Sequence, residues 1–199
     1  MEYKNISEKI IELQNADLRL RNKLIAKGEL GDGYNEEMAN LHNRNANELD
    51  IIISKIGYPT IEKVGTEASD SAWLLIQHAI GKPDFMKKCA KLLDKAVQEN
   101  KADAKHLAYL TDRIAVFENK PQTYGTQFGW DENGQLSPNL YEDLNKVNQK
   151  RKSIGLNTLQ EQTKIIRLQA EQENHKAPQD LKYWKKEMEN WKKSVGWTK

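Results

Sequence analysis

One histidine stands inside the most apolar segment of the chain. This segment runs from Ala72 to Ile80, and His78 directly follows Gln77 within it. Burial favours the neutral imidazole, which can act as a general base or as a metal ligand. The alternative is a core histidine whose ring nitrogens are satisfied inside the protein. We therefore take His78 as the first candidate for a catalytic group, and Gln77 as a candidate for binding a substrate beside it.

A second candidate pair, Asp112 and Arg113, lies between apolar residues of a segment with helical spacing. An aspartate next to His78 would fix the tautomer of the imidazole, and an arginine would bind a carboxylate or phosphate as a planar fork. We expect Asp112, or Gln77, to orient His78, and Arg113 to hold an anionic group. The alternatives are an exposed pair on a helix surface, or an arginine that ties down the following loop.

Residues 121–138 have no helical period and are rich in polar side chains. Polar loops that a rigid scaffold positions are a common place for binding sites. We expect Tyr124 to act in catalysis, and Gln122 and Gln127 to bind the substrate. Tyr124 and Gln127 would position the substrate or donate to a developing oxyanion. The alternative is a turn whose side chains satisfy its own backbone.

The sequence gives no reason to expect a metal site. His42, His106 and His175 show no ligand spacing with one another, and the single cysteine, Cys89, falls on an apolar face. The glycine-rich segment 28–33 lacks the strand and the lysine of a phosphate loop, so no cofactor can be named. Elsewhere, Asp17 lies four residues before Arg21 on the first expected helix, either as a surface pair or as a second wall of a site.

The elements that must position these residues are mainly helices. Apolar residues recur every three or four positions over most of the chain, which predicts an all-α fold. We expect a multi-helix bundle around a buried central helix at about residues 67–80, with one small β-hairpin or ordered loop over residues 121–138. Residues 1–156 are expected to form a helical core domain. Residues 157–199 are expected to form a C-terminal helical extension, capped at its start by Asn157 and either docked on the core or projecting from it.

Composition excludes several classes of function. The 199 residues include 31 lysines and arginines against 29 acidic residues, and a formal net charge of +2 steers neither nucleic acid nor an anionic membrane. No apolar run reaches the roughly 18 residues of a membrane span. The N-terminus carries charges within its apolar pattern and does not resemble a secretory signal. We therefore expect a cytoplasmic protein with no membrane partner and no nucleic-acid partner.

The C-terminal segment 177–199 combines lysines with apolar residues at helical spacing. Those apolar residues are Trp184, Met188, Trp191 and Val195. This stripe could dock on the bundle, bind a protein partner, or contact nucleic acid. Glu187 and Glu189 interrupt the basic patch, which disfavours nucleic acid.

Four strings in a fixed order carry a resemblance to a known family. They are Ala72–Ala79, Leu110–Ile114, Gln122–Gln127, and Arg151 with Gly155-Leu156. In this order they resemble a bacterial family of unknown function with the signature W-L-L-x-Q-H-A, D-R, Q-x-Y-G-T-Q and G-L, and the resemblance covers about residues 10–156. It implies that the polar signature positions share a site, but it names no substrate. Those positions are Gln77, His78, Asp112, Arg113, Gln122, Tyr124 and Gln127.

Two functions from different classes follow from these residues. The first is a hydrolase or group-transfer enzyme that acts on a small polar or anionic substrate with His78 as general base. The second is a non-enzymatic binding or interaction module, such as an immunity, regulatory or ligand-sequestering protein. The module would use the loop Tyr124–Gln127 and the C-terminal helix. The sequence leaves both functions open.

Overall fold

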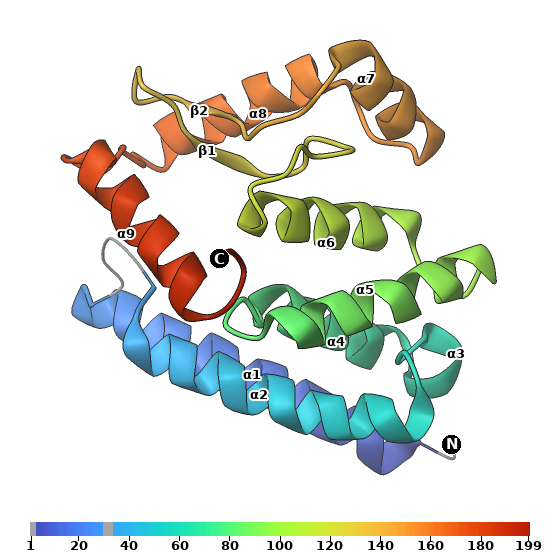
Figure 1. Cartoon of the computed structure of the whole chain (residues 1–199). Helices are drawn as coiled ribbons and strands as arrows, with labels where there is room; N and C mark the ends of the chain where they lie inside the picture. Colours follow the sequence, from blue (N-terminus) through green and yellow to red (C-terminus); the bar gives the residue numbers. More distant parts are fainter. Residues whose placement is uncertain (1–2, 30–33) are drawn as a thin grey trace. The chain divides into compact units, whose positions relative to one another are not determined.

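The computed structural model describes residues 3–29 and 34–199, and the regular secondary structure there is helical apart from one short hairpin (Figure 1). This confirms the expected all-α fold class. The contacts of the chain group it into two compact units, Met1–His106 and Leu107–Lys199, and each is described by itself. The domain division expected after residue 156 stays a prediction. Within the glycine-rich segment 28–33, residues 30–33 lie outside the described residues.

Unit 1 is built from five helices of the described chain. They are α1 (Lys4–Lys27), α2 (Glu36–Ile56), α3 (Ile61–Val64), α4 (Thr66–His78) and α5 (Pro83–Gln98). Helix α4 packs against each of the other four. Its buried positions are Ala68, Ser69, Ser71, Ala72, Leu75, Ile76 and Gln77. The expected buried central helix is therefore confirmed, and it ends at His78.

Helices α1 and α2 each carry a polar side chain on the face that they bury. The buried residues of α1 follow a spacing of three, four and seven, and they are Ile10, Leu13, Asp17 and Leu24. Residues at such spacings share one side of a helix. On α2, the buried His42 and Asn45 lie among apolar residues, and Asn45 Nδ2 donates to the Leu13 carbonyl of α1 at 3.2 Å. The core of unit 1 thus contains polar groups that its helices hold in place.

Unit 2 begins inside α6 and contains the only strands that the described residues form. Its elements are α6 (Ala104–Phe117), β1 (Phe128–Trp130), β2 (Leu136–Pro138), α7 (Leu144–Ser153), α8 (Leu159–Gln172) and α9 (Leu181–Ser194). Strands β1 and β2 pair antiparallel, which confirms the expected hairpin. The Asp131 carboxylate closes its turn by accepting from the backbone N–H groups of Asn133 and Gln135 and from Ser137 Oγ.

The start of α8 differs by one residue from the sequence-based prediction. Thr158, rather than Asn157, caps the helix and forms a capping box with Glu161. Asn157 instead accepts from the guanidinium of Arg151, with its carbonyl oxygen 2.6 Å from Nε and its Oδ1 2.9 Å from Nη2. A capping box satisfies two helix N-terminal groups reciprocally, and this favours Thr158 as the cap.

Aromatic side chains near the C-terminus pack inside unit 2. The Trp191 ring of α9 and the Trp197 ring lie 5.9 and 5.1 Å from the Phe117 ring at the end of α6. The ammonium of Lys192, which is 7% exposed, donates to Asn119 and Glu189. Trp191 of the C-terminal apolar stripe, together with Trp197, is therefore used for packing within unit 2.

Candidate functional site

Asp17 is a fully buried carboxylate at the centre of unit 1. It is 0% exposed, and its place between Leu13 and Leu24 on the inner face of α1 would ordinarily hold an apolar residue. A carboxylate in such a place needs partners, because an unpaired buried charge is costly. The partners come from two other helices.

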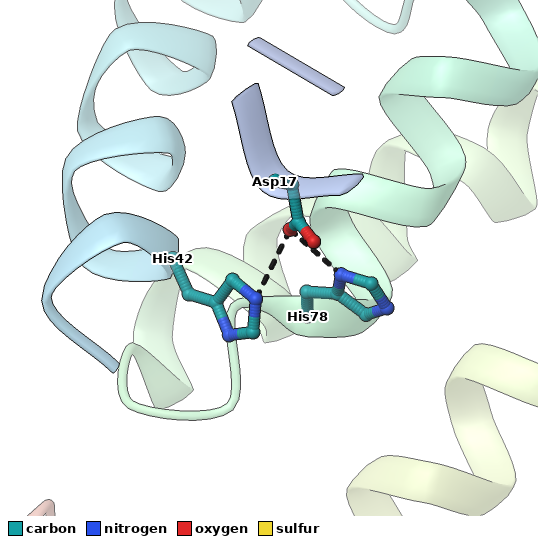
Figure 2. A group of neighbouring side chains, drawn as sticks. All are labelled: Asp17, His42 and His78. Carbon is teal, nitrogen blue, oxygen red and sulfur yellow. Dashed lines mark hydrogen bonds and ion pairs between the residues drawn. The ribbon is translucent and has the colours of Figure 1, made fainter. Parts of the chain in front are cut away.

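His42 of α2 and His78 of α4 both approach the same oxygen of Asp17, and Figure 2 shows their rings on two sides of the carboxylate. His78 Nδ1 lies 2.9 Å from Asp17 Oδ2 in a hydrogen bond. His42 Nε2 lies 3.0 Å from the same oxygen, at ion-pair distance. The two imidazole rings are 4.9 Å apart. We refer to Asp17, His42 and His78 as the Asp17 cluster.

The three members of the Asp17 cluster differ in exposure. The side chain of His42 is 8% exposed, whereas that of His78 is 26% exposed. His78 is also the last residue of α4. Among the described residues, the only hydrogen bond to its ring is the one that joins Nδ1 to Asp17. The second ring nitrogen of His78 therefore belongs to the solvent-exposed side of the cluster.

Two buried atoms of the Asp17 cluster lack a hydrogen-bond partner among the described residues. They are Asp17 Oδ1 and His42 Nε2, which is close to Oδ2 but does not have hydrogen-bond geometry. Large majorities of buried polar atoms in proteins are paired. The side chains of the Asp17 cluster are therefore close together, but their hydrogen-bonding capacity is not fully used.

Tyr34 supports His42 from the other side of the ring. Its hydroxyl lies 2.6 Å from His42 Nδ1, and the two rings stack with centroids 5.7 Å apart. Burial, together with the charge of Asp17, raises the pKa of Tyr34, so the hydroxyl stays protonated. This contact fixes the orientation of His42 and directs Nε2 towards Asp17.

The electrostatics of the cluster keep Asp17 ionised. Burial by itself would raise the pKa of Asp17, but the contacts and charge attraction of His42 and His78 outweigh it and hold this pKa well below its usual range. An ionised carboxylate beside two imidazoles can orient a base, stabilise an imidazolium, or bind a cation.

A second buried aspartate, Asp112 of α6, is satisfied by the loop that follows its helix. It is 1% exposed. Its Oδ1 accepts from the Thr123 and Tyr124 N–H groups at 2.8 and 3.1 Å. Its Oδ2 accepts from the Thr126 N–H at 2.9 Å and from Thr126 Oγ1 at 3.0 Å. Both oxygens are therefore occupied in holding residues 123–126.

Two glutamine side chains also form hydrogen bonds that hold the loop after α6. Gln122, 3% exposed, donates to the carbonyls of Gln127 and Asn139 and accepts from the Gln127 N–H at 2.7 Å. The side chain of Gln127 in turn accepts from Arg113 Nε at 3.2 Å. We call Asp112, Gln122 and Gln127, together with the residues that they bind, the Asp112 network.

Arg151 of α7 also belongs to the Asp112 network, because it binds the backbone of the loop that Asp112 holds. It is 2% exposed, and its Nη1 donates to the Tyr124 carbonyl at 2.8 Å. The loop turns at Gly125, whose φ of +64° lies in the left-handed region that glycine adopts without strain. A Cβ at this position would lie 2.9 Å from Leu159 Cδ1.

The predicted site residues are thus divided between the two units. Unit 1 contains Gln77 and His78, and unit 2 contains Asp112, Arg113, Gln122, Tyr124 and Gln127. We expected Asp112 or Gln77 at the ring of His78, whereas Asp17 is the residue bonded to its Nδ1. Gln77 is buried in α4 at 4% exposure.

Two members of the Asp17 cluster were not predicted as site residues. The sequence indicates Asp17 only as half of a surface pair with Arg21 or as a second wall of a site, and it shows no ligand spacing for His42. The available signal was their position, because each replaces an apolar residue in the repeating pattern of its helix. A polar residue on a buried helix face is the informative exception to hydrophobic burial.

The other candidate ligands lie outside the cluster. His106 stacks on Trp73 with ring centroids 4.3 Å apart, and His175 is an exposed residue near Glu173. Cys89 is buried, and burial raises the pKa of its thiol to about 12. Within the described ranges, no helix is both long and apolar enough to cross a bilayer.

These features define a helical protein with a buried Asp–His–His group in its N-terminal half. The chain belongs to a family of unknown function, DUF6624, whose model matches residues 5–173. The match therefore extends beyond the expected range of 10–156 and includes α8. No curated protein and no solved structure matches the chain. That the polar positions of the signature share one site remains a prediction.

Proposed function

We propose that the chain is a hydrolase or group-transfer enzyme that acts on a small polar or anionic substrate with His78 as general base. The observation that carries the proposal is the 2.9 Å hydrogen bond between His78 Nδ1 and the buried Asp17 Oδ2. A carboxylate at one ring nitrogen fixes the tautomer and leaves the other nitrogen to accept a proton. The partial exposure of His78 gives that nitrogen access to a substrate.

In the proposed step, His78 Nε2 takes the proton of a water molecule or hydroxyl group while the oxygen of that group attacks the substrate. The bond to the leaving group then breaks, and the His78 imidazolium returns the proton to the leaving group. The ionised Asp17 stabilises the imidazolium that forms, so Asp17 is a positioning residue. A well-placed general base accelerates a reaction about 10²- to 10⁴-fold. This range sets the loss expected when the imidazole is removed.

The remaining predicted residues keep supporting roles in the proposal. Gln77 adjoins His78 on α4 and is proposed to bind the substrate. Arg113, Tyr124 and Gln127 belong to unit 2. Their predicted roles are to hold an anionic group and to position the substrate or donate to an oxyanion; these stay predictions, and the step at His78 does not depend on them. Asp112 and Gln122 would contribute through the loop that they hold.

The test is a comparison of turnover on three chromogenic substrates, p-nitrophenyl acetate, p-nitrophenyl phosphate and bis(p-nitrophenyl) phosphate. The full chain is compared with His78→Ala and with the control His175→Ala, which removes an exposed imidazole. We expect His78→Ala to lower kcat/KM about 10²- to 10⁴-fold, and His175→Ala to leave it unchanged. Added imidazole should restore part of the activity of His78→Ala, which a purely structural residue would not allow.

Two results would count against the proposal. One is turnover that His78→Ala changes less than threefold. The other is the absence of turnover on all three substrates by a folded protein, because these compounds represent the ester and phosphate classes that the site is proposed to accept.

A second candidate function is supported by the Asp112 network. Its polar groups are satisfied within unit 2, as expected of a scaffold for a binding surface rather than of reactive side chains. On this alternative, the loop Tyr124–Gln127 and the exposed part of α9 bind a protein partner. Tyr183 of α9 is 61% exposed, so loss of a captured partner in Tyr183→Ser would support an interaction module. An unchanged partner list would count against it.

A further inference from the structure

The Asp17 cluster has a donor set that suits a metal ion. One ligand-type atom from each of Asp17, His42 and His78 can be chosen so that all three lie within 4.8 Å of one another. Two imidazoles and one carboxylate are a common protein donor set for zinc, iron and related transition metals. The ligands come from α1, α2 and α4, which pack against one another in the core of unit 1.

The distances are close to those that a bound ion requires. Ligand atoms about 2.0–2.1 Å from a tetrahedral zinc ion lie about 3–3.5 Å apart. Asp17 Oδ2 is 2.9 Å from His78 Nδ1 and 3.0 Å from His42 Nε2. Small side-chain shifts would therefore admit an ion between the three groups.

An independent observation is the pair of unsatisfied atoms, Asp17 Oδ1 and His42 Nε2. Both are buried, and neither has a hydrogen-bond partner among the described residues. A carboxylate oxygen and an imidazole nitrogen can both donate electron pairs to a cation, so one ion would satisfy both atoms. The alternative to an ion is a hydrogen bond between His42 Nε2 and Asp17 Oδ2. That bond would satisfy His42 but would leave Asp17 Oδ1 without a partner among the described residues.

The surroundings of His42 also match a metal ligand. Metal-binding imidazoles almost always use their second nitrogen in an outer hydrogen bond, which orients the ring. His42 Nδ1 has this contact with the Tyr34 hydroxyl at 2.6 Å. On the other side of the cluster, the 26% exposure of His78 leaves an approach from solvent.

We propose that Asp17, His42 and His78 bind one divalent transition-metal ion of the zinc, iron or cobalt type. The inference deepens the proposed function, on which it rests for the catalytic role of this site. A bound ion would replace the hydrogen bond between Asp17 Oδ2 and His78 Nδ1. The metal-bound form would therefore be an alternative to His78 as general base for the same proposed reaction, with a water molecule on the metal as the nucleophile. Binding itself can be measured without any substrate.

The first measurement is a titration of the EDTA-treated full chain with Co²⁺, followed by visible absorption and by calorimetry. We expect one ion per chain and a Kd in the micromolar range or below. His42→Ala and Asp17→Asn should each weaken binding at least 100-fold, because each removes a ligand. His175→Ala is the matched control and should bind as the unaltered chain does.

Tyr34→Phe tests the outer contact. The loss of such a partner typically weakens metal binding about 10- to 100-fold while all ligands remain. Circular dichroism checks that each variant is folded. If one ligand variant does not fold, the other ligand variant and Tyr34→Phe still decide the outcome.

A second readout is thermal. An ion at 100 times its Kd should raise the Tm of the folded chain by about 5–10 °C. Absence of binding by the unaltered chain overturns the inference. Binding that both ligand variants retain within threefold also overturns it.

Failure of the inference and failure of the proposed function are distinguishable. Tight binding without turnover on the substrate panel supports the metal site and rejects the enzyme. Turnover that survives EDTA and still needs His78 supports the general base and rejects the metal.

Discussion

Among the described residues, each of the two units buries one aspartate, but the two carboxylates have different partners. Asp17 in unit 1 and Asp112 in unit 2 are 0% and 1% exposed. Asp112 accepts hydrogen bonds on both oxygens from three backbone N–H groups and one hydroxyl. Asp17 offers one oxygen to two histidines and leaves the other without a partner among the described residues.

The comparison separates two uses of a buried charge. Backbone donors around Asp112 neither move nor titrate, so that carboxylate fixes the conformation of residues 123–126. Imidazoles around Asp17 can gain or lose a proton and can accept a metal. Burial is therefore shared by both aspartates, and it is the chemistry of the partners that marks the Asp17 cluster as the candidate site.

The largest effect on stability should come from Asp112→Asn. An amide has one acceptor oxygen, so its NH₂ group faces backbone donors and leaves about two of them buried without a partner. At about 1–3 kcal/mol for each buried unsatisfied group, we expect the free energy of unfolding to fall by about 3–5 kcal/mol. Urea unfolding followed by tryptophan fluorescence measures this change, because Trp130, Trp184, Trp191 and Trp197 all belong to unit 2.

The matched variant is Asp17→Asn, which makes the same substitution in unit 1. Its amide oxygen can still accept from His78 Nδ1, but the attraction between the carboxylate charge and the two imidazoles is lost. We expect a loss of about 1–2 kcal/mol, measured by circular dichroism. Equal losses in the two variants would remove the distinction between the aspartates.

A smaller effect is expected at Gly125, in the loop that Asp112 holds. Gly125→Ala places a side chain at a φ of +64° and a Cβ 2.9 Å from Leu159, which is 2% exposed. Left-handed backbone costs about 1–2 kcal/mol for residues other than glycine, and the crowding adds to it. We expect a total loss of about 2–3 kcal/mol in urea unfolding.

Gly134→Ala is the control for backbone strain alone. Its φ is +70°, but its Cβ would meet only Ala177 at 3.7 Å, an ordinary contact. The control should cost about 1 kcal/mol. A loss at Gly125 no greater than that at Gly134 would show that the loop is not packed tightly against Leu159.

The helices could be predicted from the sequence because they depend on local patterns. The all-α class, the buried central helix and the hairpin of β1 and β2 follow from apolar spacing and turn residues, and the structure confirms them. The central helix was predicted at about residues 67–80 and is observed over Thr66–His78. The prediction of Asn157 as the cap of α8 was wrong by one residue, and Thr158 is the cap. Asn and Thr are both good N-caps, so the sequence alone does not choose between them. Only the contacts of Arg151 show what Asn157 does instead.

The candidate site could be predicted only in part. His78 was evident because a histidine in an apolar run is unusual. Its partner was not, since Asp17 lies 61 residues away along the chain. The packing of α1 and α2 against α4 brings Asp17 and His42 to His78, and neither spacing nor composition specifies such contacts. Asp112 has an equally apolar setting in the sequence, but its partners lie in its own loop.

The smallest effect on stability is expected from His78→Ala, and it bears most directly on function. The side chain is 26% exposed and makes one hydrogen bond, to an aspartate that keeps His42. We expect a loss of about 1 kcal/mol or less, or about 2–4 °C in Tm. His42→Ala should cost about 2–3 kcal/mol, because it is 8% exposed and also bonded to Tyr34. If His78→Ala proved the more damaging of the two, His78 would be a structural core residue, and the proposed base would lose its main support. A near-neutral result would mean that a histidine has been retained at the end of a buried helix where stability does not require it, as expected of a residue kept for chemistry.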